Sequence, residues 1–222
     1  MIPIICIVGS ANVGKTTVLE QLIPALKRRG YRVGALKHDV HGFEMDHQGK
    51  DTWKHKRAGA DTIAIAGPTQ VASIRSTAAE MPIEETVARY FWSERIVLAE
   101  GYKRSHFPKI EVFRAELAAE PLCTEPGDNL IAMVSDDPPP VEVPCYGFQQ
   151  IDELAALLEE RYLKERKQHP VEVRLDGKKL PLKGFVQDII QGALRGMLSS
   201  LRGWKEPNRI TVEIQCDGDP DR

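Results

Sequence analysis

The feature that most limits how this chain can fold is an apolar run that ends in a glycine-rich turn and continues into a helical pattern. Residues 2–8 are almost wholly apolar and mostly β-branched, as in a buried strand. The turn that follows is Gly9-Ser10-Ala11-Asn12-Val13-Gly14-Lys15-Thr16-Thr17. After it, apolar residues recur at spacings of three and four through Leu26, which predicts a helix. A strand, a glycine-rich turn of this spacing and a helix together predict a phosphate-binding loop, the Walker A motif.

The residue types of this turn suit the wrapping of phosphate groups by main-chain N–H groups. Gly9 and Gly14 allow positive φ and leave no side chain in the way of an anion. The helix that begins near Lys15 directs its positive dipole end at the same place. We expect Lys15 to reach the terminal phosphates of a nucleotide and the Thr16 hydroxyl to coordinate Mg²⁺.

Two carboxylates follow predicted strands and are candidates for the same site. Asp39 follows a strand over residues 32–37, in position to hold Mg²⁺ directly or through water. Glu100 ends a strand over residues 95–99 and is expected across from Thr16, either in the Mg²⁺ shell or orienting an attacking water. The alternatives are a helix cap or loop carboxylate for Asp39 and a structural acid at a strand end for Glu100. We therefore predict catalytic roles for Lys15 and Glu100, and metal ligation by Thr16, Asp39 and Glu100.

Four of the six histidines fall within eighteen residues, at His38, His41, His47 and His55. Their density invites a metal-site interpretation, because neutral imidazole is a common ligand of transition metals. Their spacings suit no single helix face and no cysteine joins them, so we favour a polar loop that faces a substrate. His38 and His41 are the candidate contacts of this loop with a substrate or partner.

A basic segment follows Glu100 and contains Lys103, Arg104, His106 and Lys109. On the same edge of the sheet it suits a phosphorylated second ligand or a protein partner. The alternative is an ordinary solvated loop, which is what most runs of charge are. Lys103 and Arg104 are the candidates that we single out.

Asp136 follows a late strand over residues 129–134. A carboxylate at that position is able to accept hydrogen bonds from the N1–H and amino group of guanine. The Asn-Lys-x-Asp pattern usual in guanine-specific proteins is absent, so Asp136 alone does not specify the base.

Composition excludes several classes of function. The 222 residues carry a formal net charge of −2, so no bulk attraction to nucleic acid or to an anionic membrane is expected. No basic segment precedes the first apolar run, and no apolar stretch approaches the ~20 residues of a membrane span. We expect a cytoplasmic protein. Its four cysteines are far apart, which fits neither a zinc knuckle nor a disulfide framework.

The chain divides into two predicted domains. Residues 1–163 form the nucleotide-binding domain, which includes a hairpin around Gly67-Pro68 and a closing amphipathic helix from Ile151. The polar stretch 164–170 is a predicted linker. Residues 171–216 predict a small module made of a hairpin, a long helix and a strand from the alternation at residues 210–214. So few residues make a marginal core, and we expect the module to dock on the first domain or to pair across a dimer.

Several segments together resemble the MobB family, molybdopterin-guanine dinucleotide biosynthesis protein B. They are GSANVGKTT, LKHDVHGFEMDHQGKDTWKHKRAGAD, VLAEGYKRSHFPKIEVFR and LIAMVSDD. The resemblance covers roughly residues 2 to 163, and the His-Asp and Glu-Gly-Tyr-Lys segments are more specific to it than the phosphate loop.

The resemblance implies a P-loop NTPase fold, α/β with a mostly parallel sheet flanked by helices, to which the pattern after residue 171 adds a small α+β module. It also implies GTP binding with weak GTPase activity, a homodimer, and a role as adapter to the molybdenum cofactor guanylyltransferase that joins GMP to a molybdopterin-type ligand. Carried over by position, residues 9–17 are the phosphate loop, Thr16, Asp39 and Glu100 the Mg²⁺ neighbourhood, and Asp136 a base contact. Hydrolysis is expected to be slow, because no arginine finger or water-positioning glutamine can be assigned.

Three alternatives use the same residues differently. A small-molecule kinase would take Asp39 or Glu100 as the base for an acceptor hydroxyl. A metal-insertion GTPase would use the clustered histidines. A pure binding module would retain nucleotide without turnover.

Overall fold

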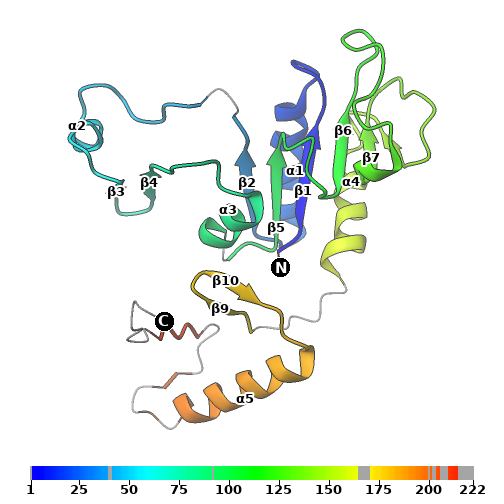
Figure 1. Cartoon of the computed structure of the whole chain (residues 1–222). Helices are drawn as coiled ribbons and strands as arrows, with labels where there is room; N and C mark the ends of the chain where they lie inside the picture. The colour runs from blue at the N-terminus through cyan, green and yellow to red at the C-terminus, as the bar shows by residue number, and fades with distance from the viewer. Residues whose placement is uncertain are drawn as a thin grey trace. The chain divides into compact units, whose positions relative to one another are not determined.

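The structure is a computed structural model that describes residues 2–39, 42–91, 93–164, 171–199, 201, 204–205 and 210–214 (Figure 1). The chain divides into two compact units, Met1–Glu165 and Arg166–Arg222. Of the linker that the sequence predicts, only Lys164 lies within the described residues. Within the described residues, no helix is both long and apolar enough to cross a membrane.

The N-terminal unit is built on a six-stranded sheet. Its strands are β1 (Ile4–Val8), β2 (Val33–Lys37), β5 (Ile96–Glu100), β6 (Lys109–Val112), β7 (Leu130–Val134) and β8 (Cys145–Tyr146). Their order across the sheet is β2-β5-β1-β6-β7-β8, and every pairing is parallel. The predicted α/β fold with a mostly parallel sheet is confirmed. Because β1 lies between β5 and β6, the turn that leaves β1 has a strand end on either side.

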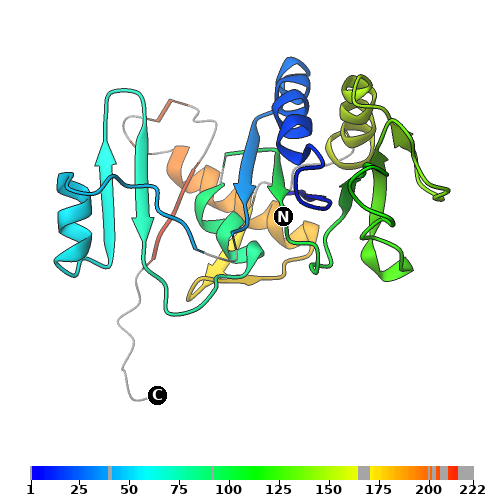
Figure 2. The ribbon, with the colours of Figure 1, turned by 90° about the horizontal axis from the view of Figure 1, so that it is seen from above.

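Helices cover both faces of this sheet. They are α1 (Lys15–Arg28), α3 (Ile83–Tyr90) and α4 (Ile151–Leu158), and short turns η1 (Pro126–Asp128) and η2 (Glu159–Leu163) complete the unit. Figure 2 shows α1 and α4 on one side of the sheet and α3 on the other. Successive side chains of a strand point to opposite faces, so Ile5 and Ile7 pack with α1 and α4, whereas Ile4, Cys6 and Val8 pack with α3. This burial on both faces explains why β1 is apolar throughout.

Between β2 and α3 the chain leaves the sheet. It forms α2 (Asp51–Arg57) and the strands β3 (Thr62–Ala66) and β4 (Val71–Arg75). The two strands pair antiparallel around Gly67-Pro68, as the sequence predicts. Figures 1 and 2 both show α2 and this hairpin, residues 51–75, standing apart from the six-stranded sheet, and we call them the arm.

The C-terminal unit contains β9 (Val173–Leu175), β10 (Lys178–Leu180) and α5 (Gly184–Ser199). The predicted hairpin and helix are confirmed, with β9 and β10 paired antiparallel. The predicted strand at residues 210–214 is wrong, because these residues pair with no strand among those described. Alternating apolar residues fit one face of a sheet, but a strand also needs a neighbour to receive its main-chain hydrogen bonds. None of the described residues of this unit is buried.

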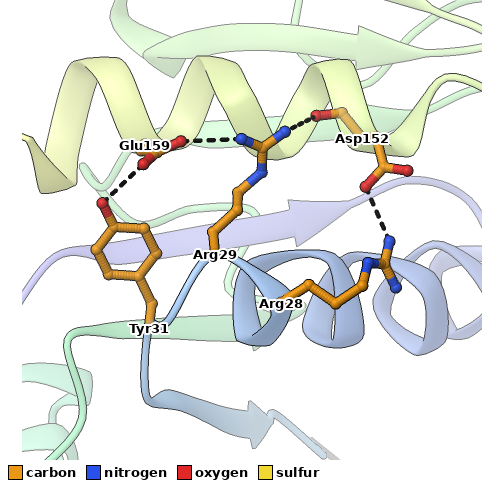
Figure 3. A network of polar contacts seen from close by, with 5 residues as sticks. All are labelled: Arg28, Arg29, Tyr31, Asp152 and Glu159. Atoms are coloured by element: carbon orange, nitrogen blue, oxygen red, sulfur yellow. Dashed lines mark hydrogen bonds and ion pairs between the residues drawn. The ribbon is translucent and has the colours of Figure 1, made fainter.

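A polar network joins the end of α1 to α4 in the N-terminal unit (Figure 3). Arg28 pairs with Asp152 at 2.9 Å, but both side chains are largely exposed, so the pair contributes little to stability. Arg29 donates to a Glu159 carboxylate oxygen at 2.9 Å and to the Asp152 main-chain oxygen at 3.0 Å. The Tyr31 hydroxyl donates to the other Glu159 oxygen at 2.9 Å. The Tyr31 bond most of all, and then the Arg29 bond to the carboxylate, hold the pKa of Glu159 below its ordinary value of 4.5, against an opposing effect of desolvation.

This network predicts a stability difference that depends on pH. A carboxyl whose pKa is lowered in the folded state stabilises the fold at pH values above its ordinary, unfolded-state pKa. This stabilisation is lost as the pH falls through the folded-state pKa. Glu159→Gln should therefore unfold at lower urea concentration than wild type at pH 7, and the two should converge as the pH falls below 4.5. The measurement is urea unfolding followed by circular dichroism across this range. Glu160→Gln, one residue along, is the matched control and should follow wild type. A difference between Glu159→Gln and wild type that stays constant to acid pH would contradict the assignment.

Candidate functional site

The glycine-rich turn occupies the space between β1 and α1 at the carboxyl edge of the sheet. Gly9, Asn12 and Gly14 have φ of 145°, 64° and 103°, so three residues of the turn lie in the region that favours glycine or asparagine. A Cβ atom at Gly9 would collide with the main-chain oxygen of Val112 on β6. The turn is therefore packed directly against the neighbouring strand.

The polar groups of this turn are directed at a small volume. Main-chain N–H groups of residues 10–14 have no hydrogen-bond acceptor among the described residues. The Lys15 ammonium bends back over the turn and donates to the main-chain oxygens of Gly9 at 3.1 Å and Ser10 at 2.7 Å. Unpaired donors, a cation and the N-terminus of α1 lie together in this turn, an arrangement that suits an anion.

A carboxylate and a hydroxyl meet on the β5 side of the turn. The Thr16 hydroxyl donates to a Glu100 carboxylate oxygen at 3.3 Å, so the predicted pairing of these residues across the edge is present. Hard oxygen ligands of this kind suit Mg²⁺ beside a bound phosphate. Asp39, two residues beyond the end of β2, is exposed at the same edge. Among the described residues, no three His, Cys, Asp or Glu side chains lie close enough together to hold a metal ion by themselves, so Mg²⁺ here would depend on phosphate and water oxygens.

His38 is engaged beside this carboxylate. Its main-chain N–H donates to the main-chain oxygen of Glu100 at 3.0 Å, and its Nε2 atom lies 2.8 Å from a Glu80 carboxylate oxygen. Its ring stacks on Tyr102, with centroids 4.3 Å apart and planes 15° from parallel. Burial, followed by the charge of Glu80, raises the pKa of Tyr102. His38 thus lies at the predicted site but already has partners, and His41 lies outside the described residues.

The basic segment after Glu100 is smaller than the sequence suggests. Lys103 and Arg104 are exposed, as predicted. Including Lys109 was wrong, because its side chain is 1% exposed and its ammonium donates to three main-chain oxygens. Lys109 is the first residue of β6, so its side chain points into the unit, where carbonyl groups replace water around the charge.

The β6 side of the turn holds a second group, in which Arg114 and Phe148, not singled out by the sequence pattern, accompany Asp136. Arg114 donates its Nε–H to the Val13 oxygen at 3.0 Å, and its guanidinium carbon lies 4.1 Å from the centroid of the Phe148 ring. Phe148 in turn donates its main-chain N–H to an Asp136 carboxylate oxygen at 3.1 Å. Asp136, the predicted base contact, is exposed at the end of β7 and tied to the phosphate loop through Phe148. One feature of the sequence marks Arg114: it is a basic residue just past a buried strand.

The structure thus brings Lys15, Thr16 and Glu100 together at one edge, with Arg114 and Asp136 across the turn. Glu100 lies on the β5 side with the exposed Lys103 and Arg104 after it, and the Arg114 guanidinium lies on the β6 side, where Asp136 bonds to Phe148.

Comparison with known proteins gives one family. The model of "Molybdopterin guanine dinucleotide synthesis protein B" matches residues 4–136, which span the sheet from β1 to the end of β7. The chain is 31% identical over 159 residues to the molybdopterin-guanine dinucleotide biosynthesis adapter protein of Haemophilus influenzae, covering 71% of this chain and 88% of that protein. The putative adapter protein of Methanocaldococcus jannaschii is 23% identical over 236 residues, which cover 95% of this chain and 97% of that protein.

Solved structures agree with the fold. The crystal structure of Bacillus subtilis MobB superimposes with a TM-score of 0.56 at 26% identity, covering 70% of this chain and 97% of that one.

Proposed function

This chain belongs to the family of molybdopterin guanine dinucleotide synthesis protein B, and from that membership we propose that it is an adapter in the biosynthesis of this dinucleotide that binds GTP with Mg²⁺. The observation that carries the proposal is the turn at residues 9–17, whose N–H groups at residues 10–14 lack acceptors among the described residues. Lys15 supplies the positive charge for the terminal phosphates. Thr16 and Glu100 supply oxygens on the side where the metal is expected.

Weak GTPase activity is part of the proposal. Mg²⁺, when bound, neutralises charge on the β- and γ-phosphate oxygens. Glu100 is in position to orient the attacking water, because it ends the strand beside the loop. The sequence offers no arginine finger and no assignable water-positioning glutamine, which favours slow turnover.

The surface beyond Glu100 is the proposed contact with a partner. Lys103 and Arg104 are exposed directly after the carboxylate, and His38 lies beside it. Two exposed cations suit the phosphate of a molybdopterin-type ligand or an acidic face of the guanylyltransferase.

We further propose a homodimer formed through the arm. Its strands β3 and β4 pair only with each other among the described residues, so each has an open edge. Ile65 on β3 is 61% exposed, and Met45, which lines the same pocket as Ile65 on that face of the hairpin, is 75% exposed. Large apolar side chains exposed on one surface are typical of an interface, and a second copy offers the same surface in return.

Nucleotide binding is tested by calorimetry of GTP and of ATP with Mg²⁺. Wild type should prefer GTP, and Lys15→Ala should weaken GTP binding at least about tenfold, since a charge-assisted hydrogen bond contributes about 1.5–3 kcal/mol. Lys27→Ala, an exposed lysine at the end of α1, is the control and should bind like wild type. Preference for ATP would remove the guanine assignment and favour the kinase alternative. No binding of either nucleotide would refute the proposal.

Partner binding is tested by reversing charge after Glu100. Lys103→Glu with Arg104→Glu should weaken binding to the molybdenum cofactor guanylyltransferase at least about tenfold in a titration, since reversal turns attraction into repulsion. GTP binding should change by less than about twofold, because neither residue contacts the phosphate loop. Lys27→Glu with Arg161→Glu makes the same change in net charge elsewhere and should bind normally. Unchanged partner binding by the first variant would place the contact on another surface.

The dimer is tested by sedimentation velocity. Met45→Lys with Ile65→Lys should convert a wild-type dimer into a monomer with unchanged circular dichroism, because burial of two ammonium groups at an interface is costly. Leu117→Lys, at a leucine 51% exposed outside the arm, should remain dimeric. A wild type that sediments as a monomer, or an arm variant that stays dimeric, would rule out this interface.

A further inference from the structure

Arg114 occupies a defined place relative to the phosphate loop. It lies two residues past the end of β6, which pairs with β1 on the side opposite β5. Phe113 still continues the ladder, with its N–H donating to the Val134 oxygen at 2.9 Å. Arg114 is therefore the first residue to leave the sheet beside the loop, across from Glu100. Because Thr16 and Glu100 put the metal of the proposed nucleotide on the β5 side, we expect its sugar and base to extend toward β6, the other neighbour of β1.

Three elements fix the orientation of the guanidinium. The Nε–H donates to the Val13 oxygen in the phosphate loop at 3.0 Å, and one face of the group lies over the Phe148 ring at 4.1 Å. Phe148 is held by Asp136 through its main-chain N–H, and its ring approaches Gly14 so closely that a Cβ there would lie 3.3 Å from Cε1. A cation over an aromatic face with one nitrogen already bonded has little freedom to rotate.

The remaining nitrogens of Arg114 are available. Its two terminal amino groups have no hydrogen-bond acceptor and no carboxylate partner among the described residues. The side chain is half-buried, so it is neither free in solvent nor enclosed. A half-buried guanidinium with unused donors in fixed orientation is able to recognise two adjacent acceptors.

We propose that the terminal N–H groups of Arg114 donate to N7 and O6 of the guanine ring of the bound nucleotide, a step that rests on the proposed GTP binding. These two acceptors lie side by side on one edge of guanine and match the spacing of a guanidinium fork. Adenine has a donor amino group in place of O6, so a group that only donates discriminates against it. Arg114 thus supplies a guanine-selective contact in a chain without the usual guanine motif.

The test is a titration of GTP, 7-deaza-GTP and inorganic tripolyphosphate, each with Mg²⁺, into wild type and Arg114→Ala. The 7-deaza analogue lacks only the N7 acceptor, and tripolyphosphate lacks the base and the sugar. Wild type should bind GTP about tenfold more tightly than 7-deaza-GTP, the lower end of the range for such a contact. Arg114→Ala should bind both nucleotides equally and weakly, with tripolyphosphate affinity unchanged within about twofold. Arg89→Ala, an exposed arginine paired with Glu85 on α3, should retain the wild-type discrimination.

Each contrary result has its own meaning. Equal binding of GTP and 7-deaza-GTP by wild type would overturn the base contact. Equal loss of GTP and tripolyphosphate by Arg114→Ala would also overturn it, because Arg114 would then only support the loop through Val13. Wild type that binds neither GTP nor tripolyphosphate would refute the proposed function itself, and the inference with it.

Discussion

The close approach of the Gly9 main chain to the Val112 carbonyl is the contact on which the rest of the site depends. β1 is buried on both faces and paired on both edges, so the phosphate loop leaves the sheet from a fixed point. A side chain at Gly9 would push the loop away from β6 and would move the start of α1 with it. The unpaired N–H groups, the Lys15 ammonium and the Thr16 hydroxyl all take their positions from that point.

Strand order then divides the chemistry of the site. Thr16 meets Glu100 across 84 residues of sequence, and Val13 meets Arg114 across 101. The first contact lies toward β5 and the second toward β6, because both strands pair with β1. The Thr16–Glu100 contact and the Arg114 guanidinium therefore lie on opposite sides of the loop, where each can meet a different part of a bound ligand.

The sequence could predict those features that are set by residues close together in the chain. The first strand, the phosphate loop, the helix after it and the hairpin around Gly67-Pro68 follow from patterns of a few residues, and all are present. Lys109 was misjudged because a lysine in a basic segment is normally solvated, and only the strand placement shows three carbonyls around it. The alternation of apolar residues at 210–214 was insufficient to predict a strand, because a strand also needs a partner strand from elsewhere in the chain. Arg114 carried almost no signal, since its importance comes from a neighbour 101 residues away.

The segment between β2 and α3 carries the arm, and the two ends of this segment lie close together. His38 begins it and Glu80 nearly ends it, and their side chains lie 2.8 Å apart, while β2 and β5 on either side are direct neighbours in the sheet. Closing such a loop costs an entropy that rises only with the logarithm of its length. The chain between β2 and β5 is thus a single crossover connection that carries the arm, and its length adds little to the cost of setting the register of β2 on β5.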